Sequence, residues 1–124
     1  MILLDTWAWV EYFKGTKNGE KIANIIKTEQ TYTSAISIAE LSKWFYNNNT
    51  NIEIAINQLK ENSIILELND NILIEAGRLH SQLRKTRKKI GIIDTIIYAT
   101  SLIKSLEVLT NDSDFLGLPN VKNI

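Results

Sequence analysis

Four acidic residues, widely separated in the chain, stand where a carboxylate can bind a divalent cation. Asp5 and Asp112 follow short apolar runs, Glu40 lies in the first turn after Ser37, and Asp94 opens a long apolar segment. Mg²⁺ and Mn²⁺ prefer oxygen ligands, which carboxylates from distant segments can supply. Such an ion can polarise a phosphodiester and activate a water for attack, so that no protein nucleophile is needed. The residue types therefore favour metal-dependent hydrolysis.

Each of these acids also has a structural explanation. Ser37 and Glu40 have the spacing of a capping box, in which the glutamate bonds back to the backbone at the start of a helix. Asp5, Asp94 and Asp112 have the positions of helix caps or first-turn acids. Taken singly, these explanations are the more common ones. Taken together, the four acids would repel one another at one edge of a sheet unless a cation lay between them.

The elements that must position these acids alternate between short apolar runs and helical patterns. Strands are expected at 2–4, 31–34, 64–66 and 106–109, with a weak last strand from Val121, and helices at 7–13, 20–27, 38–45, 52–59, 72–83 and 92–103. This order predicts parallel pairing with right-handed crossovers, that is, an α/β protein with a three-layer α/β/α sandwich and a central, mostly parallel sheet. Ligands of such sheets bind beyond the carboxyl ends of the strands, where the acids are expected.

The composition is that of one soluble globular domain covering residues 1–124. The absence of cysteine excludes disulfides and thiolate zinc sites, and a single histidine, His80, argues against any zinc site. Fourteen basic residues balance fourteen acidic ones, so the net charge says nothing about nucleic-acid binding. No apolar run is long enough to span a membrane and no secretory signal is visible, so we expect a cytoplasmic protein with no membrane contact.

A basic run, Arg84–Lys89, is predicted to end the 72–83 helix, where cations suit the helix dipole. The same run is a candidate phosphate grip, with Arg84, Arg87 and Lys88 as the substrate-binding residues. The two interpretations are compatible. The aromatic residues are expected in the core or at subunit contacts rather than as base-stacking platforms; they are Trp7, Trp9, Trp44, Phe45 and Tyr46.

Four blocks of sequence carry a family resemblance. They are Leu3-Leu-Asp5-Thr-Trp-Ala-Trp9, Ser34-Ala-Ile-Ser-Ile-Ala-Glu40-Leu, Ile92-Ile-Asp94-Thr-Ile-Ile-Tyr-Ala-Thr100 and Leu109-Thr110-Asn-Asp112-Ser-Asp-Phe115. In this order and spacing they resemble the PIN domain over the whole chain, especially the VapC-type toxins of type II toxin–antitoxin systems.

The resemblance implies a PIN-like fold and a Mg²⁺- or Mn²⁺-dependent endoribonuclease acting on single-stranded or structured RNA. It implies that Asp5 and Asp94 are the principal metal ligands, that Glu40 completes the acidic pocket, and that Asp112 holds the metal directly or through water. Thr110 would orient the last loop. A homodimer and a groove for a cognate antitoxin are the partners implied.

The chain departs from the family pattern at two points. Trp7 replaces a small residue, and we expect it to pack beneath the pocket rather than narrow it. Asp114 lies two residues beyond Asp112 and is a second candidate for the fourth acid. Two other functions remain open: a stand-alone PIN nuclease that processes RNA, and a non-catalytic PIN module that binds RNA or protein. The second is disfavoured because all four family positions are acidic.

Overall fold

The computed structural model describes all residues from Met1 to Ile124. Its centre is a five-stranded sheet in the order β3-β2-β1-β4-β5, and every neighbouring pair is parallel. The strands are β1 (Ile2–Leu4), β2 (Thr31–Ser34), β3 (Ile64–Leu66), β4 (Glu107–Leu109) and β5 (Val121–Lys122). The sequence prediction of a mostly parallel sheet is therefore confirmed.

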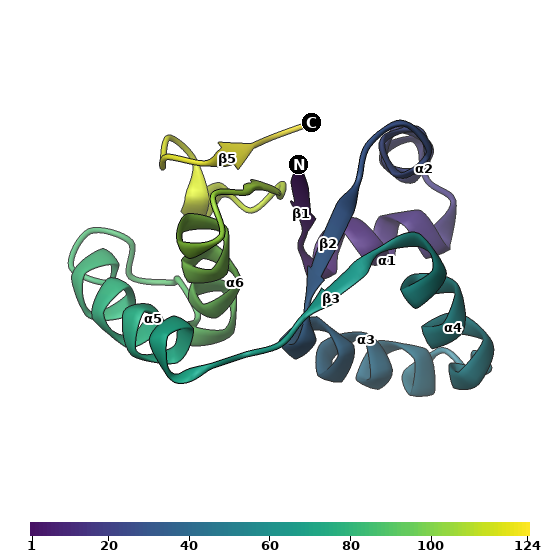
Figure 1. Cartoon of the computed structure of the whole chain (residues 1–124), viewed down its shortest axis with the longest axis horizontal. Helices are drawn as coiled ribbons and strands as arrows, with labels where there is room; N and C mark the ends of the chain where they lie inside the picture. The colour runs from purple at the N-terminus through teal and green to yellow at the C-terminus, as the bar shows by residue number, and fades with distance from the viewer.

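Helices cover both faces of this sheet, as Figure 1 shows. They are α1 (Thr6–Lys14), α2 (Lys17–Thr28), α3 (Ala35–Asn47), α4 (Ile52–Asn62), α5 (Asp70–Leu83) and α6 (Ile92–Ile103), with a short 3₁₀ turn, η1 (Ser113–Phe115). Helices α1 to α4 lie on one face, and α5 and α6 lie on the other. The expected three-layer sandwich is confirmed. None of the helices has the length and apolar character needed to cross a membrane.

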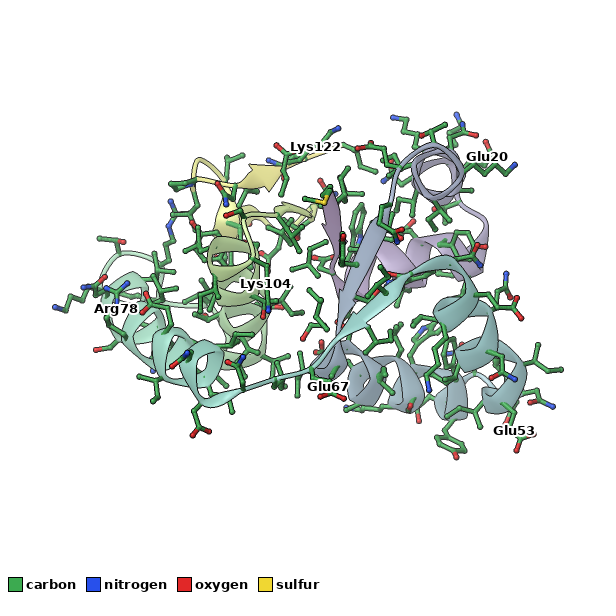
Figure 2. All side chains as sticks on the ribbon, in the orientation of Figure 1. Glu20, Glu53, Glu67, Arg78, Lys104 and Lys122 are labelled. Atoms are coloured by element: carbon green, nitrogen blue, oxygen red, sulfur yellow. The ribbon has the colours of Figure 1, made fainter.

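Two apolar cores lie on opposite faces of the sheet, and the central strand β1 supplies both. Ile2 and Leu4 point into the core under α1 to α4, whereas Leu3 points into the core under α5 and α6. This division follows from the two-residue period of a strand. Charged side chains labelled in Figure 2, such as Glu53 and Arg78, lie at the outer edge of the molecule, away from both cores.

Helix α1 and helix α2 are joined by a tight turn whose chemistry is visible in the sequence. Gly15 ends α1 in the left-handed conformation, with φ of 69°, and Thr16 caps α2 by accepting a hydrogen bond from the Gly19 amide at 3.0 Å. At Gly19 the two helices approach closely, because a Cβ there would lie 2.1 Å from the carbonyl oxygen of Glu11. Glycine is therefore required at this crossing.

Two local predictions need correction. Helix α5 ends at Leu83, so the basic run follows the helix in a series of turns instead of forming its last turn. Helix α6 is buried from Ile97 to Ser101, but Ile92 and Ile103 at its two ends are 46% and 42% exposed. It is thus a central helix with open ends rather than one buried throughout.

Candidate functional site

The topology brings Asp5 and Thr110 side by side at the carboxyl edge of the sheet. Asp5 directly follows β1, Thr110 follows the neighbouring β4, and the Asp5 amide donates to the Leu109 carbonyl at 3.4 Å. Asp94, from the first turn of α6, lines the same small cavity. The cavity volume of about 10 Å³ is close to what one ordered water needs. The apolar residues that line it are Ile97, Tyr98, Val108 and Phe115.

Asp5 is a buried carboxylate at the start of α1. Its Oδ1 accepts a hydrogen bond from the Ala8 amide at 2.8 Å, so the capping role considered from the sequence is real. Burial is the main cause that raises the pKa of Asp5 to about 7, against the opposing hydrogen bonds from Thr110 and Ala8. The charges of Asp94 and Asp112 raise it further. A helix cap alone would not need a carboxylate with so perturbed a pKa.

Asp94 is the carboxylate on which the charges of three other acids act. Burial raises its pKa to about 6, and the negative charges of Asp112, Glu40 and Asp114 add to the shift. Like charges shift one another's pKa in this way only when they are close. The carboxylates from four remote segments therefore share one electrostatic environment.

Glu40 is held by a residue that the sequence analysis missed. The Thr6 hydroxyl donates to Glu40 Oε1 at 2.6 Å and lies 3.1 Å from Ser37 Oγ. The capping-box explanation is wrong, because α3 begins earlier and Ser34 is its N-cap, with Oγ accepting from the Ile36 amide. The available signal for Thr6 was its place beside Asp5, a hydroxyl at the exit of a strand.

Asp112 occupies the turn that follows β4. Its amide donates to Thr110 Oγ1 at 3.1 Å, and its Oδ1 accepts from the Asp114 amide at 2.9 Å. Asp112 acts on the pKa of both Asp5 and Asp94, whereas Asp114 acts on that of Asp94 only. Of the two candidates for the fourth acid, Asp112 is therefore the one more closely tied to the pocket.

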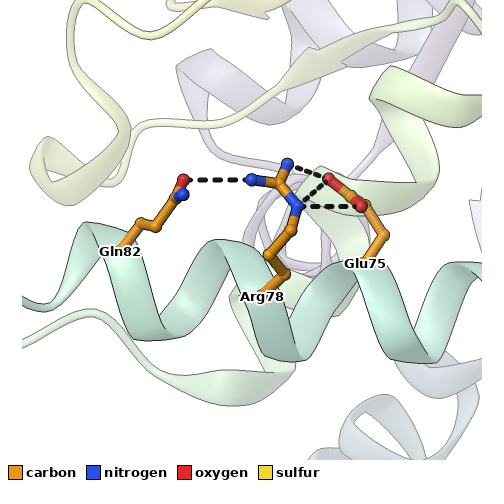
Figure 3. Close-up of polar contacts among 3 residues, drawn as sticks. All are labelled: Glu75, Arg78 and Gln82. Atoms are coloured by element: carbon orange, nitrogen blue, oxygen red, sulfur yellow. Dashed lines mark hydrogen bonds and ion pairs between the residues drawn. The ribbon is translucent and has the colours of Figure 1, made fainter.

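The acids do not form a ready-made coordination shell, since no three Asp, Glu, His or Cys side chains converge closely enough to hold a metal ion. The donor set nevertheless fits a hard divalent cation, because it is built from carboxylate oxygens. None of these acids is neutralised by a basic side chain: the ion pair of the molecule joins Arg78 to Glu75 on the surface of α5, as Figure 3 shows. A bound cation would neutralise the unpaired negative charge of these carboxylates and would lower the raised pKa values of Asp5 and Asp94.

The structure separates the three basic residues proposed to bind substrate. Arg84 and Lys88 are exposed on the turns after α5. Arg87 is half-buried, and its Nη1 donates to the Asp114 carbonyl at 2.6 Å. Only Arg87 thus reaches the loop that carries the fourth acid.

The aromatic residues divide between core and surface. Trp9 and Phe45 are fully buried, and Trp7 and Trp44 are partly buried against the same core. Trp7 thus packs against a core, as predicted, but this is the core under α1 to α4, and Trp7 is not among the residues that line the pocket. Tyr46 is 68% exposed and packs in neither core.

A parallel α/β/α sandwich with carboxylates at the carboxyl ends of its strands defines an α/β protein with an acidic candidate site at that edge of the sheet. More specifically, the chain belongs to the PIN-domain family, whose sequence profile matches residues 2–120. No curated protein sequence matches the chain.

Solved structures with the same fold cover nearly the whole chain. One is described as a toxin–antitoxin complex from Klebsiella pneumoniae, with 22% identity, a TM-score of 0.80 and coverage of 98% of this chain and 96% of the other. Another is VapBC2 from Rickettsia felis bound to a promoter DNA fragment, with 20% identity, a TM-score of 0.80 and coverage of 100% and 99%. A third is VapC20 of Mycobacterium tuberculosis, described as a Sarcin-Ricin loop cleaving toxin, with 15% identity, a TM-score of 0.70 and coverage of 93% and 92%.

Proposed function

We propose that this chain is a Mg²⁺- or Mn²⁺-dependent endoribonuclease that acts in the cytoplasm as the toxin of a VapBC-type toxin–antitoxin pair. The observation that carries the proposal is the group of carboxylates around Asp94 in a PIN domain, whose negative charges raise the pKa of Asp94 and which have no basic partner. The similarity to toxin–antitoxin structures supports the biological role. The description of VapC20 as a Sarcin-Ricin loop cleaving toxin supports the choice of RNA as the proposed substrate class.

In this proposal Asp5 and Asp94 hold the ion, Glu40 completes the pocket, and Asp112 binds directly or through water. A bound ion would supply a Lewis acid for the phosphodiester and lower the pKa of the attacking water. Thr6, the residue after Asp5, holds the Glu40 carboxylate by donating a hydrogen bond to Glu40 Oε1.

The substrate contacts in this proposal come from residues around the pocket. Thr110 accepts the Asp112 amide and so fixes the start of the last loop. The exposed cations Arg84 and Lys88 bind RNA phosphates on the outside of the pocket.

The test is cleavage of single-stranded RNA by the purified protein in Mn²⁺. Asp94→Asn should abolish cleavage, because it removes a ligand charge while keeping the size of the side chain. The matched control is Asp70→Asn, which changes an exposed first-turn aspartate of the neighbouring helix α5. Undiminished cleavage by Asp94→Asn, with a normal circular dichroism spectrum, would contradict the proposed function.

A growth assay separates a toxin from a stand-alone RNA-processing nuclease. Expression of the wild type should arrest growth, expression of Asp94→Asn should not, and co-expression of the cognate antitoxin should restore it. We propose that the antitoxin inserts a basic side chain into the acidic pocket, where it would take the place of the cation. Cleavage without growth arrest would favour the processing role, and RNA binding without cleavage would favour a non-catalytic module.

We also propose that the protein is a homodimer. Ile74 on α5 is 72% exposed, and it lines a shallow groove with Leu102 and Ile103 of α6. Exposed aliphatic side chains gathered in one place are typical of an interface. Analytical ultracentrifugation of the wild type should show a dimer, and Ile74→Glu should shift it toward the monomer. A wild-type monomer would exclude this part of the proposal.

A further inference from the structure

The turn that carries Asp112 is held in shape by its own hydrogen bonds, but its position depends on contacts with other elements. The Asp114 amide donates to Asp112 Oδ1, and the Phe115 amide donates to the Asp112 carbonyl at 3.1 Å. These bonds are internal, so they fix the shape of the turn and leave its place against α6 open. Phe115 supplies one anchor, since its buried ring packs against Tyr98 of α6 with 5.7 Å between ring centroids.

The second anchor is Arg87, which comes from a different part of the chain. Its Nη1 donates to the Asp114 carbonyl at 2.6 Å, a charge-assisted hydrogen bond to the backbone of the turn itself. The bond is half-buried, so water competes with it less than at an open surface. The turn is therefore held between a ring on one side and a guanidinium on the other.

Arg87 is itself fixed by its surroundings. Its amide donates to the Leu83 carbonyl at 2.7 Å, and its carbonyl accepts from the Ile90 amide at 3.2 Å. The Ile90 side chain is buried, and the Ile90 carbonyl is 3.1 Å from His80 Nε2 on α5. The Arg87 side chain that reaches the turn thus extends from a backbone that is hydrogen-bonded to α5.

Arg87 does not act as a counterion of the pocket. It forms no ion pair with any carboxylate, and its described contact is with a backbone carbonyl. This distinguishes it from the rest of the basic run, whose side chains are exposed. Its influence on the site is through the position of the turn.

We infer that Arg87 is a positioning residue which, by bonding the Asp114 carbonyl, holds the Asp112 turn against α6 and so sets the place of the fourth acid. The inference rests on the proposed function, in which Asp112 takes part in holding the ion. It changes the role of Arg87 expected from the sequence, where it was a phosphate contact. Residues that orient metal ligands commonly change metal affinity by about 10- to 100-fold when they are replaced.

The experiment measures Mn²⁺ binding in the absence of RNA, by electron paramagnetic resonance of the free ion. Arg87→Ala should weaken Mn²⁺ binding by about tenfold. Arg87→Lys, which keeps a cationic donor for the carbonyl, should recover part of the loss. The control is Lys85→Ala, which removes one charge from the same run at an exposed position and should bind Mn²⁺ as the wild type does.

Equal Mn²⁺ affinity of Arg87→Ala and the wild type would overturn the inference, as would an equal loss in Lys85→Ala. An Arg87→Lys variant no better than Arg87→Ala would also count against it. Failure of the proposed function would give a different result. The wild type would then bind no Mn²⁺, or it would bind Mn²⁺ as tightly as Asp94→Asn does. If Arg87→Ala does not fold, Arg87→Lys is compared with Lys85→Ala instead. Arg87→Lys should then bind Mn²⁺ more weakly than Lys85→Ala, and equal affinities would overturn the inference.

Discussion

Replacement of Asp5 by asparagine should stabilise the metal-free protein at neutral and alkaline pH. Asparagine keeps the oxygen that accepts the Ala8 amide, so the cap of α1 is retained, while the buried charge is removed. Burial raises the pKa of Asp5 from 3.8 to about 7, a difference of about 3 units. At about 1.4 kcal/mol per unit, the ionised form costs the folded state about 4 kcal/mol.

The sign of the pH dependence follows from this raised pKa. Between about pH 4 and pH 7 the native state binds a proton at Asp5 that the unfolded state has already released. The free energy of unfolding therefore falls as the pH rises through this window and stays low above it. In Asp5→Asn the contribution of Asp5 to this decrease in the free energy of unfolding should be absent. The smaller contribution of Asp94, whose pKa is raised to about 6, should remain.

The assay is urea unfolding from pH 4 to pH 8 in the presence of EDTA. Asp5→Asn and the wild type should have similar stability near pH 4, and the variant should be the more stable one at pH 8. The exposed Asp70→Asn should follow the wild type at every pH. A variant that is less stable than the wild type at pH 8, or that has the same pH profile, would refute the reasoning from burial.

Three further outcomes are expected. Gly19→Ala should lower the melting temperature, because its Cβ would overlap a backbone carbonyl. Gly77→Ala, in open space on α5, should instead stabilise the protein by up to about 1 kcal/mol, and differential scanning fluorimetry compares the two variants. Thr6→Val should reduce the rate of Mn²⁺-dependent RNA cleavage about tenfold with little change in melting temperature, because the Glu40 carboxylate loses its hydrogen-bond donor. An unchanged rate would show that Thr6 has no role in the site. MnCl₂ at pH 8 should raise the melting temperature of the wild type and not that of Asp94→Asn, because binding to the folded state alone stabilises it.

The layers of the fold were predictable because they depend on local periodicity. Strand β1 alternates its side chains between two cores, and this alternation requires helices on both faces. The edge of the sheet at which the acids meet was also predictable, since all parallel strands end on the same side. Asp5 and Asp112 could be placed there from the end of a strand alone.

The contacts that orient the acids were not predictable, because they depend on tertiary distances. Ser37 and Glu40 have a local spacing that suits a cap, and only the structure, in which α3 begins at Ala35 with Ser34 as its N-cap, shows that the cap lies elsewhere. The bond from Thr6 to Glu40 joins two helices. The bond from Arg87 to the Asp114 carbonyl likewise crosses between two turns that no sequence period relates.

The pairing of β1 with β4 sets the order in which the pocket can come into being during synthesis. Ile2 pairs with Glu107, so β1 can pair with β4 only after the ribosome has made the long stretch of chain between them. Thr110 and Asp112 emerge later still, and the ribosome must release them before they can join Asp5. A nascent chain thus carries Asp5 long before Asp112, and the pocket can be completed only after Asp112 has left the ribosome.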